Sequence, residues 1–479
     1  MNKSMSLGLY ISVPFCRTKC SYCNFASDVF SKSAYENYVA RLLEDIANSH
    51  QLASELGCAL GSTADSIYLG GGTPSILDAP QLLRIFAAVR GQFTVTPDVE
   101  ITVECAPGTL TPALIETLLL CGVNRVSLGV QSFVDQEAQS VGRLHKRSTV
   151  LEEIGRLRES GLGDISIDLI AGLPHQTAES WAFSVSETIA TGVPHVSVYM
   201  LEVDDDSRLG RELIAGGARY HAHFVPDDDA TADFYQQACE MLASDGIAQY
   251  EISNFARVDP RNSKLQSNQS RHNLKYWTRQ PYLGFGVDAH SMLELAWGRE
   301  PSPVQAERSS AAAGGHRNSG FATAIDRIEA ERPQAIRFAT PDSLDAYMDR
   351  EPRTVTPVSR QAAIEETFFL GLRLNRGIDL ERLQTGSSLG EGHDFNRATN
   401  AAEKTTLAAE ATRCRQQEFS CETVPAWDTA IQQSMREGLL EQQGTTVRLT
   451  ARGRLLSNEV FARFLSEETK VGTGHVNPR

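Results

Sequence analysis

Three cysteines near the N-terminus have the type and the spacing to hold a metal cofactor. Cys16, Cys20 and Cys23 form a C-x3-C-x2-C run. Soft thiolate ligands held this close suit an iron–sulfur cluster, and a cuboidal [4Fe–4S] unit would keep one iron without a protein ligand. That open iron could bind a small molecule. Two alternatives stay open: a zinc site completed by a distant histidine, and three unrelated buried thiols.

A glycine-rich loop is the second candidate. Gly70, Gly71 and Gly72 follow an apolar run and precede Thr73 and Pro74. Glycine permits a close approach of the backbone to a ligand, such as the amino or carboxylate group of a small molecule. Because no lysine follows the glycines, the loop does not match a triphosphate-binding loop. A tight turn between a strand and a helix is the alternative.

Polar side chains also lie at or just past the ends of later apolar runs. They are Glu104, Gln131, Arg143 and Asp168. Asp168 lies between Ile167 and Leu169 and so interrupts a run that reads as a buried strand. A buried charge must be paired, so a ligand contact and a structural ion pair between Asp168 and Arg143 are both open.

Histidines give two further candidates. His272, Tyr276 and Trp277 lie in the run HNLKYW, where an imidazole could ligate haem iron and the rings could stack on the macrocycle. A hydrogen-bonded histidine without a ligand is the alternative. His221 and His223 form an H-x-H pair that could bind a metal, although solvated loop histidines are the simpler interpretation because no further ligand follows.

The elements that must position these residues alternate along the chain. Strands are predicted at 9–13, 66–69, 100–104, 125–129, 164–170 and 195–201, and helices at 34–55, 79–92, 112–121, 149–160 and 178–190. This alternation predicts βαβ units and a parallel sheet, and six units suit a barrel or partial barrel. Ligands of such folds bind at the carboxyl ends of the strands. The candidate residues converge there, which is stronger evidence than any one motif.

The chain is predicted to have three parts: a barrel domain at 1–295, a linker or insertion region at 296–359 and a C-terminal domain at 360–479. The C-terminal pattern of helix, short hairpin and helix resembles a winged helix. Two stretches rich in small and polar residues, 300–320 and 385–420, are predicted to be insertions.

Composition excludes some partners. The 479 residues carry a formal net charge of −15, from 45 basic and 60 acidic residues, which argues against nucleic acid as the main partner and makes a DNA-binding tail the weakest hypothesis. No apolar run of about 18 residues predicts a transmembrane helix, and the N-terminus does not resemble a signal peptide. The nine cysteines are an odd number, and three of them are clustered, so we expect a cytoplasmic protein in a reducing compartment.

Taken together, the motifs resemble those of the radical S-adenosylmethionine (SAM) family. The C-x3-C-x2-C run, the GGGTP loop and the segments VECAPGTL, SLGVQSF and ISIDLIAGLP are similar to one branch of it. That branch contains the oxygen-independent coproporphyrinogen III dehydrogenases and the HemW-type haem chaperones. The resemblance covers about residues 7–295 and returns near the C-terminus. It implies an α/β fold, a radical-SAM partial (βα)6 barrel with a C-terminal mostly helical, winged-helix-like domain.

The resemblance also implies cofactors and their ligands. Cys16, Cys20 and Cys23 would hold a [4Fe–4S] cluster whose open iron takes SAM. Reduction of the SAM sulfonium would give a 5′-deoxyadenosyl radical in a radical reaction. The positions where family members contact SAM are Tyr10, Tyr22, Gly71, Gly72, Thr73, Glu104, Gln131, Arg143, Asp168 and Met200.

Two details favour the chaperones over the dehydrogenases. The dehydrogenases carry a further cysteine two positions after the third ligand, where this chain has Phe25, and a longer segment than the 15 residues before Cys16. The HNxxYW motif resembles the haem site of the chaperones and implies that His272, Tyr276 and Trp277 bind haem. The expected function is transfer of haem to acceptor haem proteins, such as respiratory ones, and a homodimer is compatible with it. The dehydrogenase is the alternative, so whether the chain is an enzyme stays open.

Overall fold

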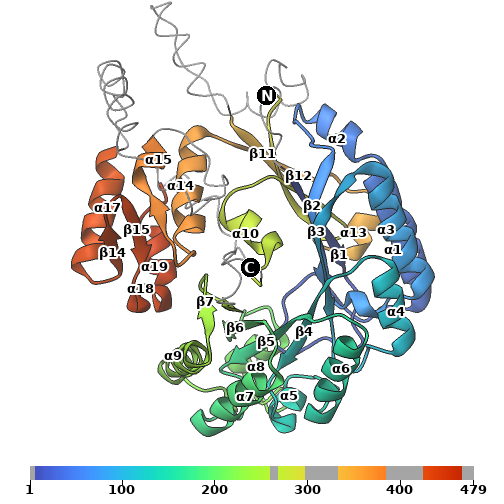
Figure 1. Ribbon diagram of the computed structural model, residues 1–479, viewed down its shortest axis with the longest axis horizontal. Coiled ribbons are helices and arrows are strands. Elements are labelled where there is room, and N and C mark those ends of the chain that lie inside the picture. Colours follow the sequence, from blue (N-terminus) through green and yellow to red (C-terminus); the bar gives the residue numbers. More distant parts are fainter. Residues whose placement is uncertain (1–5, 259–267, 297–332, 385–423, 467–479) are drawn as a thin grey trace, which may run out of the picture. The chain divides into compact units, whose positions relative to one another are not determined.

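The computed structural model describes residues 6–258, 268–296, 333–384 and 424–466, which belong to two compact units, Met1–Ala363 and Ile364–Arg479 (Figure 1). A twelve-stranded sheet, in the order β12-β11-β10-β9-β1-β2-β3-β4-β5-β6-β8-β7, forms the first unit. Its six consecutive parallel strands are β1 (Leu7–Val13), β2 (Thr63–Gly71), β3 (Thr94–Cys105), β4 (Arg125–Gln131), β5 (Asp164–Ala171) and β6 (His195–Met200). The six predicted strands are confirmed.

Helices connect the parallel strands along the outer side of the sheet (Figure 1). They are α1 (Lys32–Ala47), α2 (Ser49–Glu55), α3 (Ala79–Gln92), α4 (Pro112–Leu120), α5 (Asp135–Ser140), α6 (Arg147–Glu159) and α7 (Ala178–Thr191). Asp78 begins α3 with a capping box, in which its side chain accepts from the backbone N–H of Gln81. The single helix predicted at 34–55 is wrong in one respect. It breaks at Asn48 into α1 and α2, because asparagine favours caps over helix interiors.

The parallel strands carry apolar side chains on one face and polar ones on the other. Leu9, Ile67, Val103 and Ile167 are at most 1% exposed and belong to the core. Successive side chains of a strand point to opposite faces, so the intervening residues share the inner face. They include Tyr10, Ser66, Tyr68, Glu100, Glu104, Ser127 and Asp168. The inner face is therefore polar before any ligand is considered.

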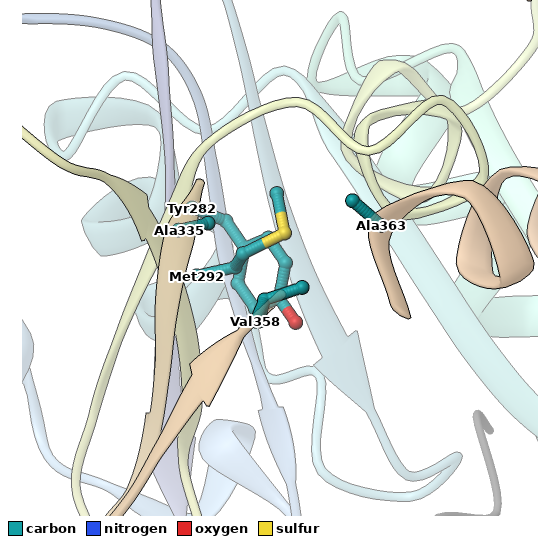
Figure 2. Packing of buried hydrophobic residues seen from close by; sticks show 5 residues of the cluster. All are labelled: Tyr282, Met292, Ala335, Val358 and Ala363. Atoms are coloured by element: carbon teal, nitrogen blue, oxygen red, sulfur yellow. The ribbon is translucent and has the colours of Figure 1, made fainter. Parts of the chain in front are cut away.

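Further strands extend the sheet at both edges. Beyond β6 lie β8 (Asn254–Arg257) and β7 (Ile247–Gln249), and beyond β1 lie β9 (Tyr282–Phe285), β10 (His290–Glu294), β11 (Ala335–Ala339) and β12 (Thr354–Val358). Figure 2 shows the apolar cluster that joins four of these strands, β9 to β12, to the start of the next helix; its members are Tyr282, Met292, Ala335, Val358 and Ala363.

The structure places part of the region expected to be a linker inside the first unit. Residues 335–358 form β11, α13 (Leu344–Met348) and β12. Ile336 and Phe338 are 1% and 3% exposed, so their burial attaches this segment to the sheet. The stretches 300–320 and 385–420 lie outside the described residues, and the three-part division of the chain stays a prediction.

The second unit contains most of α14 (Arg360–Gly371), followed by α15 (Leu380–Gln384), α17 (Val424–Arg436), α18 (Ala451–Leu455) and α19 (Ser457–Ala462). Its small sheet has the order β13 (Ile378–Asp379), β15 (Thr446–Leu449), β14 (Leu440–Gln443). The rings of Phe368 and Phe464 stack with centroids 4.6 Å apart and join the first helix to the end of the last. The predicted order of helix, hairpin and helix is confirmed. None of the described helices is long and apolar enough to cross a membrane.

Candidate functional site

The three cysteines lie on the loop that follows β1. All three are free thiols and partly exposed, and the backbone N–H of Cys23 donates to the carbonyl of Cys20 over 3.3 Å. Burial, and to a smaller extent the charge of neighbouring thiolates, raises the pKa of Cys16 and Cys23. Metal binding to such thiols releases their protons, which removes this penalty. Within the described ranges, no three His, Cys, Asp or Glu side chains meet closely enough to hold one metal ion.

The glycine loop after β2 contacts the start of the cysteine loop. The backbone N–H groups of Gly72 and Thr73 donate to the carbonyls of Val13 and Phe15 over 2.9 and 2.8 Å. A Cβ on Gly72 would lie 2.7 Å from the Val13 oxygen, which explains why glycine is needed there. The Thr73 hydroxyl also lies 3.7 Å from the sulfur of Cys16. The GGGTP motif therefore supports the cysteine loop directly.

An acidic segment after β6 holds the same loop from another side. The side-chain amide of Asn24 donates to Asp204 over 2.7 Å, and the backbone N–H of Leu209 donates to the carbonyl of Ser21 over 2.8 Å. Arg208 donates to the carbonyl of Lys19 over 3.3 Å. No role is predicted from the sequence for residues 201–208. The structure shows that they anchor the cysteine loop, a contact between segments 180 residues apart.

Glu104 lies at the carboxyl end of β3 on the inner face. The hydroxyl of Tyr68 donates to its Oε1 over 2.8 Å, and Gly70 leaves it room, since a Cβ there would lie 2.8 Å from the same oxygen. Burial raises the pKa of Glu104 to about 7, although the hydrogen bond from Tyr68 acts in the opposite direction. A cationic group that binds beside such a buried carboxyl group stabilises its ionised form.

Arg143 contacts the cysteine loop and has a buried donor without a partner among the described residues. Its Nη2 donates to the hydroxyl of Tyr22 over 3.3 Å, whereas its Nε is buried and has no partner among the described residues. A Cβ on Gly129 would lie 3.1 Å from Nη2 of Arg143 and 3.0 Å from Nε2 of Gln131. Gln131 itself has a left-handed φ of 69°, an uncommon conformation that is enriched at functional sites. These features fit a site that receives an anionic group.

Asp168 lies on β5 beside the same polar residues. The Ser127 hydroxyl donates to its two oxygens over 3.1 and 2.9 Å, and burial raises its pKa. In the described structure Asp168 is held by serine hydroxyls and Arg143 by Tyr22, so the ion pair considered from the sequence is not formed. Tyr10 stacks near Tyr68 with centroids 6.1 Å apart. Met200 ends β6 opposite Ala171 of β5, and so joins this group through the sheet.

His272 is deeply buried on α10 (Arg271–Trp277), a short helix that contacts β2 and lies on the inner side of the sheet (Figure 1). The side chain is 1% exposed, its Nδ1 lies 3.0 Å from the Ser66 hydroxyl and its Nε2 lies 2.8 Å from the Tyr276 hydroxyl. Burial, with a smaller effect of Lys275, lowers the pKa of His272 to about 3. The imidazole is therefore neutral at physiological pH, and both nitrogens are engaged.

Residues that the sequence did not single out position this helix. Glu100 accepts the backbone N–H groups of Arg271 and His272, each over 2.9 Å. The Tyr68 ring stacks on His272 with centroids 5.2 Å apart while its hydroxyl contacts Glu104, so Tyr68 links the two groups of polar residues. The period-two alternation of β2 and β3 could have identified Ser66, Tyr68 and Glu100, because it puts them on the inner face.

Comparison with known proteins identifies the family. A model of the radical SAM superfamily matches residues 10–185, and one of the HemN C-terminal domain matches residues 358–414. Heme chaperone HemW of Escherichia coli is 32% identical over 300 residues, which cover 62% of this chain and 73% of that protein. The chain belongs to the HemW family of radical SAM proteins. Heme chaperone HemW of Lactococcus lactis is 28% identical over 459 residues, which cover 96% of this chain and 97% of that protein.

A solved structure supports the fold of this HemW-family chain. Coproporphyrinogen III oxidase (HemN) from Escherichia coli, a radical SAM enzyme, matches with a TM-score of 0.67 at 20% identity, covering 96% of this chain and 90% of that one. At this identity the match shows the fold alone. The predicted family and the predicted α/β partial barrel with its C-terminal domain are confirmed. The roles of individual residues stay predictions.

Proposed function

We propose that this chain is a cytoplasmic haem chaperone, which binds haem and transfers it to acceptor haem proteins, such as respiratory ones. The observation that carries the proposal is the state of His272, a neutral imidazole held on the HNxxYW helix against the inner face of the sheet. Two HemW relatives that are named heme chaperones align with 96% of the chain, which supports the same function.

Both ring nitrogens of His272 have hydroxyl partners, and either tautomer satisfies both contacts. We propose the tautomer in which Nδ1 donates to Ser66, so that Nε2 carries the lone pair and accepts from the Tyr276 hydroxyl. Haem iron binds the lone pair of a neutral imidazole, and the pKa of about 3 keeps that lone pair free of a proton at neutral pH. The Tyr276 hydroxyl must therefore leave Nε2 before iron can bind there. Trp277, 5% exposed on the same helix, would pack against an apolar ligand once the helix opens.

The residues at the carboxyl ends of the strands fit the cofactors that the family implies. Cys16, Cys20 and Cys23 would hold a [4Fe–4S] cluster, which when bound would supply electron transfer and an open iron for SAM. The buried unpartnered Nε of Arg143 suits a carboxylate, and the raised pKa of Glu104 suits an amino group. The carboxylate of Asp168 would accept hydrogen bonds from ribose hydroxyls. The other proposed SAM contacts are Tyr10, Tyr22, Gly71, Gly72, Thr73, Gln131 and Met200.

Haem titration of anaerobically reconstituted protein, followed at the Soret band, tests the proposal. We expect saturation at about one haem per chain with micromolar or tighter affinity. His272→Ala should weaken binding at least tenfold and leave the cluster spectrum unchanged. His50→Ala, which alters an exposed histidine on α2, is the matched control. Haem binding that is equal in His272→Ala and in the unmodified protein would remove His272 from the site.

Weak binding that does not saturate would contradict the chaperone and favour the dehydrogenase. Anaerobic turnover with SAM, a reductant and coproporphyrinogen III, giving protoporphyrinogen, would then establish the enzyme. Sedimentation of the protein with and without its cluster tests the homodimer that the family resemblance allows.

A further inference from the structure

A pair of histidines lies outside the regions described above. His175 follows β5 in the loop before α7, and His221 directly precedes η2 (Ala222–Phe224). Nε2 of His175 lies 3.3 Å from Nδ1 of His221, and the ring centroids are 5.1 Å apart. Both rings are partly exposed, so a solute can reach them. The sequence drew attention to His221 and His223 but did not connect them with His175.

The spacing of the two nitrogens matches a metal site. Two imidazole nitrogens that bind one tetrahedral cation at about 2.0–2.1 Å are about 3.3 Å apart. At this length the two rings also form an N–H···N hydrogen bond. A cation that replaces the shared proton would therefore find both nitrogens already at the spacing of two ligands.

The backbone on both sides of the pair is held in an unusual shape. His175 and His221 have left-handed φ angles of 70° and 61°. Such conformations cost energy, and they cluster at binding and catalytic sites. The backbone N–H of His175 donates to the carbonyl of Phe224 over 3.0 Å, which joins the two loops.

A buried carboxylate fixes the loop that carries His221. Glu212 on α8 (Arg208–Ala215) accepts the backbone N–H of Tyr220 over 2.8 Å and that of Ala222 over 3.2 Å. These two residues flank His221, so its position is set by a side chain that is itself 9% exposed.

We propose that His175 and His221 bind a divalent transition-metal cation of the Zn²⁺ type. Water molecules would complete the coordination shell. The described residues hold no preformed group of three ligands, so the preformed part of the site is the pair alone. The proposal is independent of the proposed haem function.

Metal titration of the full chain tests the site. Cys16, Cys20 and Cys23 are replaced by serine to remove competing thiolates, and Co²⁺ serves as a spectroscopic probe beside calorimetry with Zn²⁺. We expect one cation per chain, micromolar affinity and the visible bands of tetrahedral Co²⁺. His175→Asn and His221→Asn should each weaken binding at least tenfold. Asparagine tolerates a left-handed φ, so these variants keep the backbone.

Two controls keep the result interpretable. His50→Asn should leave affinity unchanged, and thermal unfolding shows whether each variant is folded. The same histidine variants in the cluster-loaded native chain give a second background if the serine variant does not fold. Equal affinity in His175→Asn, His221→Asn and their parent would overturn the proposal, as would binding that does not saturate. Haem binding should stay unchanged in His221→Asn, which separates this site from the haem site.

Discussion

His272 differs from Arg143 and Glu104 in how far its hydrogen-bonding capacity is used within the described residues. Toward the amino ends of the strands, His272 uses both ring nitrogens, on Ser66 and Tyr276. At the carboxyl ends, Arg143 keeps a buried Nε without a described partner, and Glu104 has a pKa raised by burial to about 7. A buried donor without a partner costs about 1–3 kcal/mol, which a ligand that accepts from Arg143 would offset.

The difference separates two ways of binding. The carboxyl end resembles a preformed site, in which ligand groups would meet protein groups that already lack partners. His272 is buried and both of its nitrogens are hydrogen-bonded, so haem must first replace contacts that the protein makes with itself. We therefore expect changes at the carboxyl end to remove binding, and changes at the His272 pocket to alter how readily it opens.

The largest expected effect is loss of the cluster. Cys20→Ser removes one of the three proposed ligands on a loop that offers no substitute, so reconstituted protein should lose the visible absorption of the cluster and most of its iron and sulfide. Cys239→Ser, on α9 (Asp228–Ser244), is the control and should keep both. A cluster that survives in Cys20→Ser would show that this thiol is not a ligand.

The next effect concerns the pH dependence of SAM binding. Because the pKa of Glu104 is about 7, its carboxylate is mostly ionised at pH 8 and mostly protonated at pH 6. An amino group pairs with the ionised form, so SAM affinity should fall about tenfold from pH 8 to pH 6. Calorimetry across this range should give a flat profile for Glu104→Gln and an unchanged one for Glu116→Gln on the exposed side of α4. A slope that persists in Glu104→Gln would belong to the ligand.

A smaller effect is expected at the proposed haem site, where a substitution should strengthen haem binding rather than weaken it. Tyr276→Phe removes the hydroxyl that occupies Nε2 of His272 and keeps the ring. One hydrogen bond of about 1 kcal/mol no longer opposes opening, so haem should bind about fivefold more tightly or faster. Stopped-flow measurement of the Soret change would show this. Weaker binding in Tyr276→Phe would mean that the hydroxyl itself contacts haem, and the contrast between the two ends would fail.

The sequence predicted the features that depend on local pattern. Strand ends follow from apolar runs and turns, and the cysteine motif is a short run. Both could therefore be predicted without knowledge of tertiary contacts. The burial of His272 could not, because it depends on Ser66, which lies 206 residues away. The same holds for His175, whose partner His221 is brought to it by folding. The pairing of β11 with β10 could not be predicted either, because it joins strands that are far apart in the sequence.

The smallest expected effect tests the support of the cysteine loop. Asp204 accepts a hydrogen bond of 2.7 Å from the side chain of Asn24, the residue that follows Cys23. Asp204→Ala removes this bond, worth about 1 kcal/mol, while every thiol stays in place. The cluster should therefore still assemble but release iron to a chelator two- to fivefold faster. Asp205→Ala, an exposed neighbour of the same charge, should release iron at the normal rate. If both variants release iron equally fast, the negative charge of the segment matters rather than the contact, and the preformed character of the carboxyl end would not depend on this anchor.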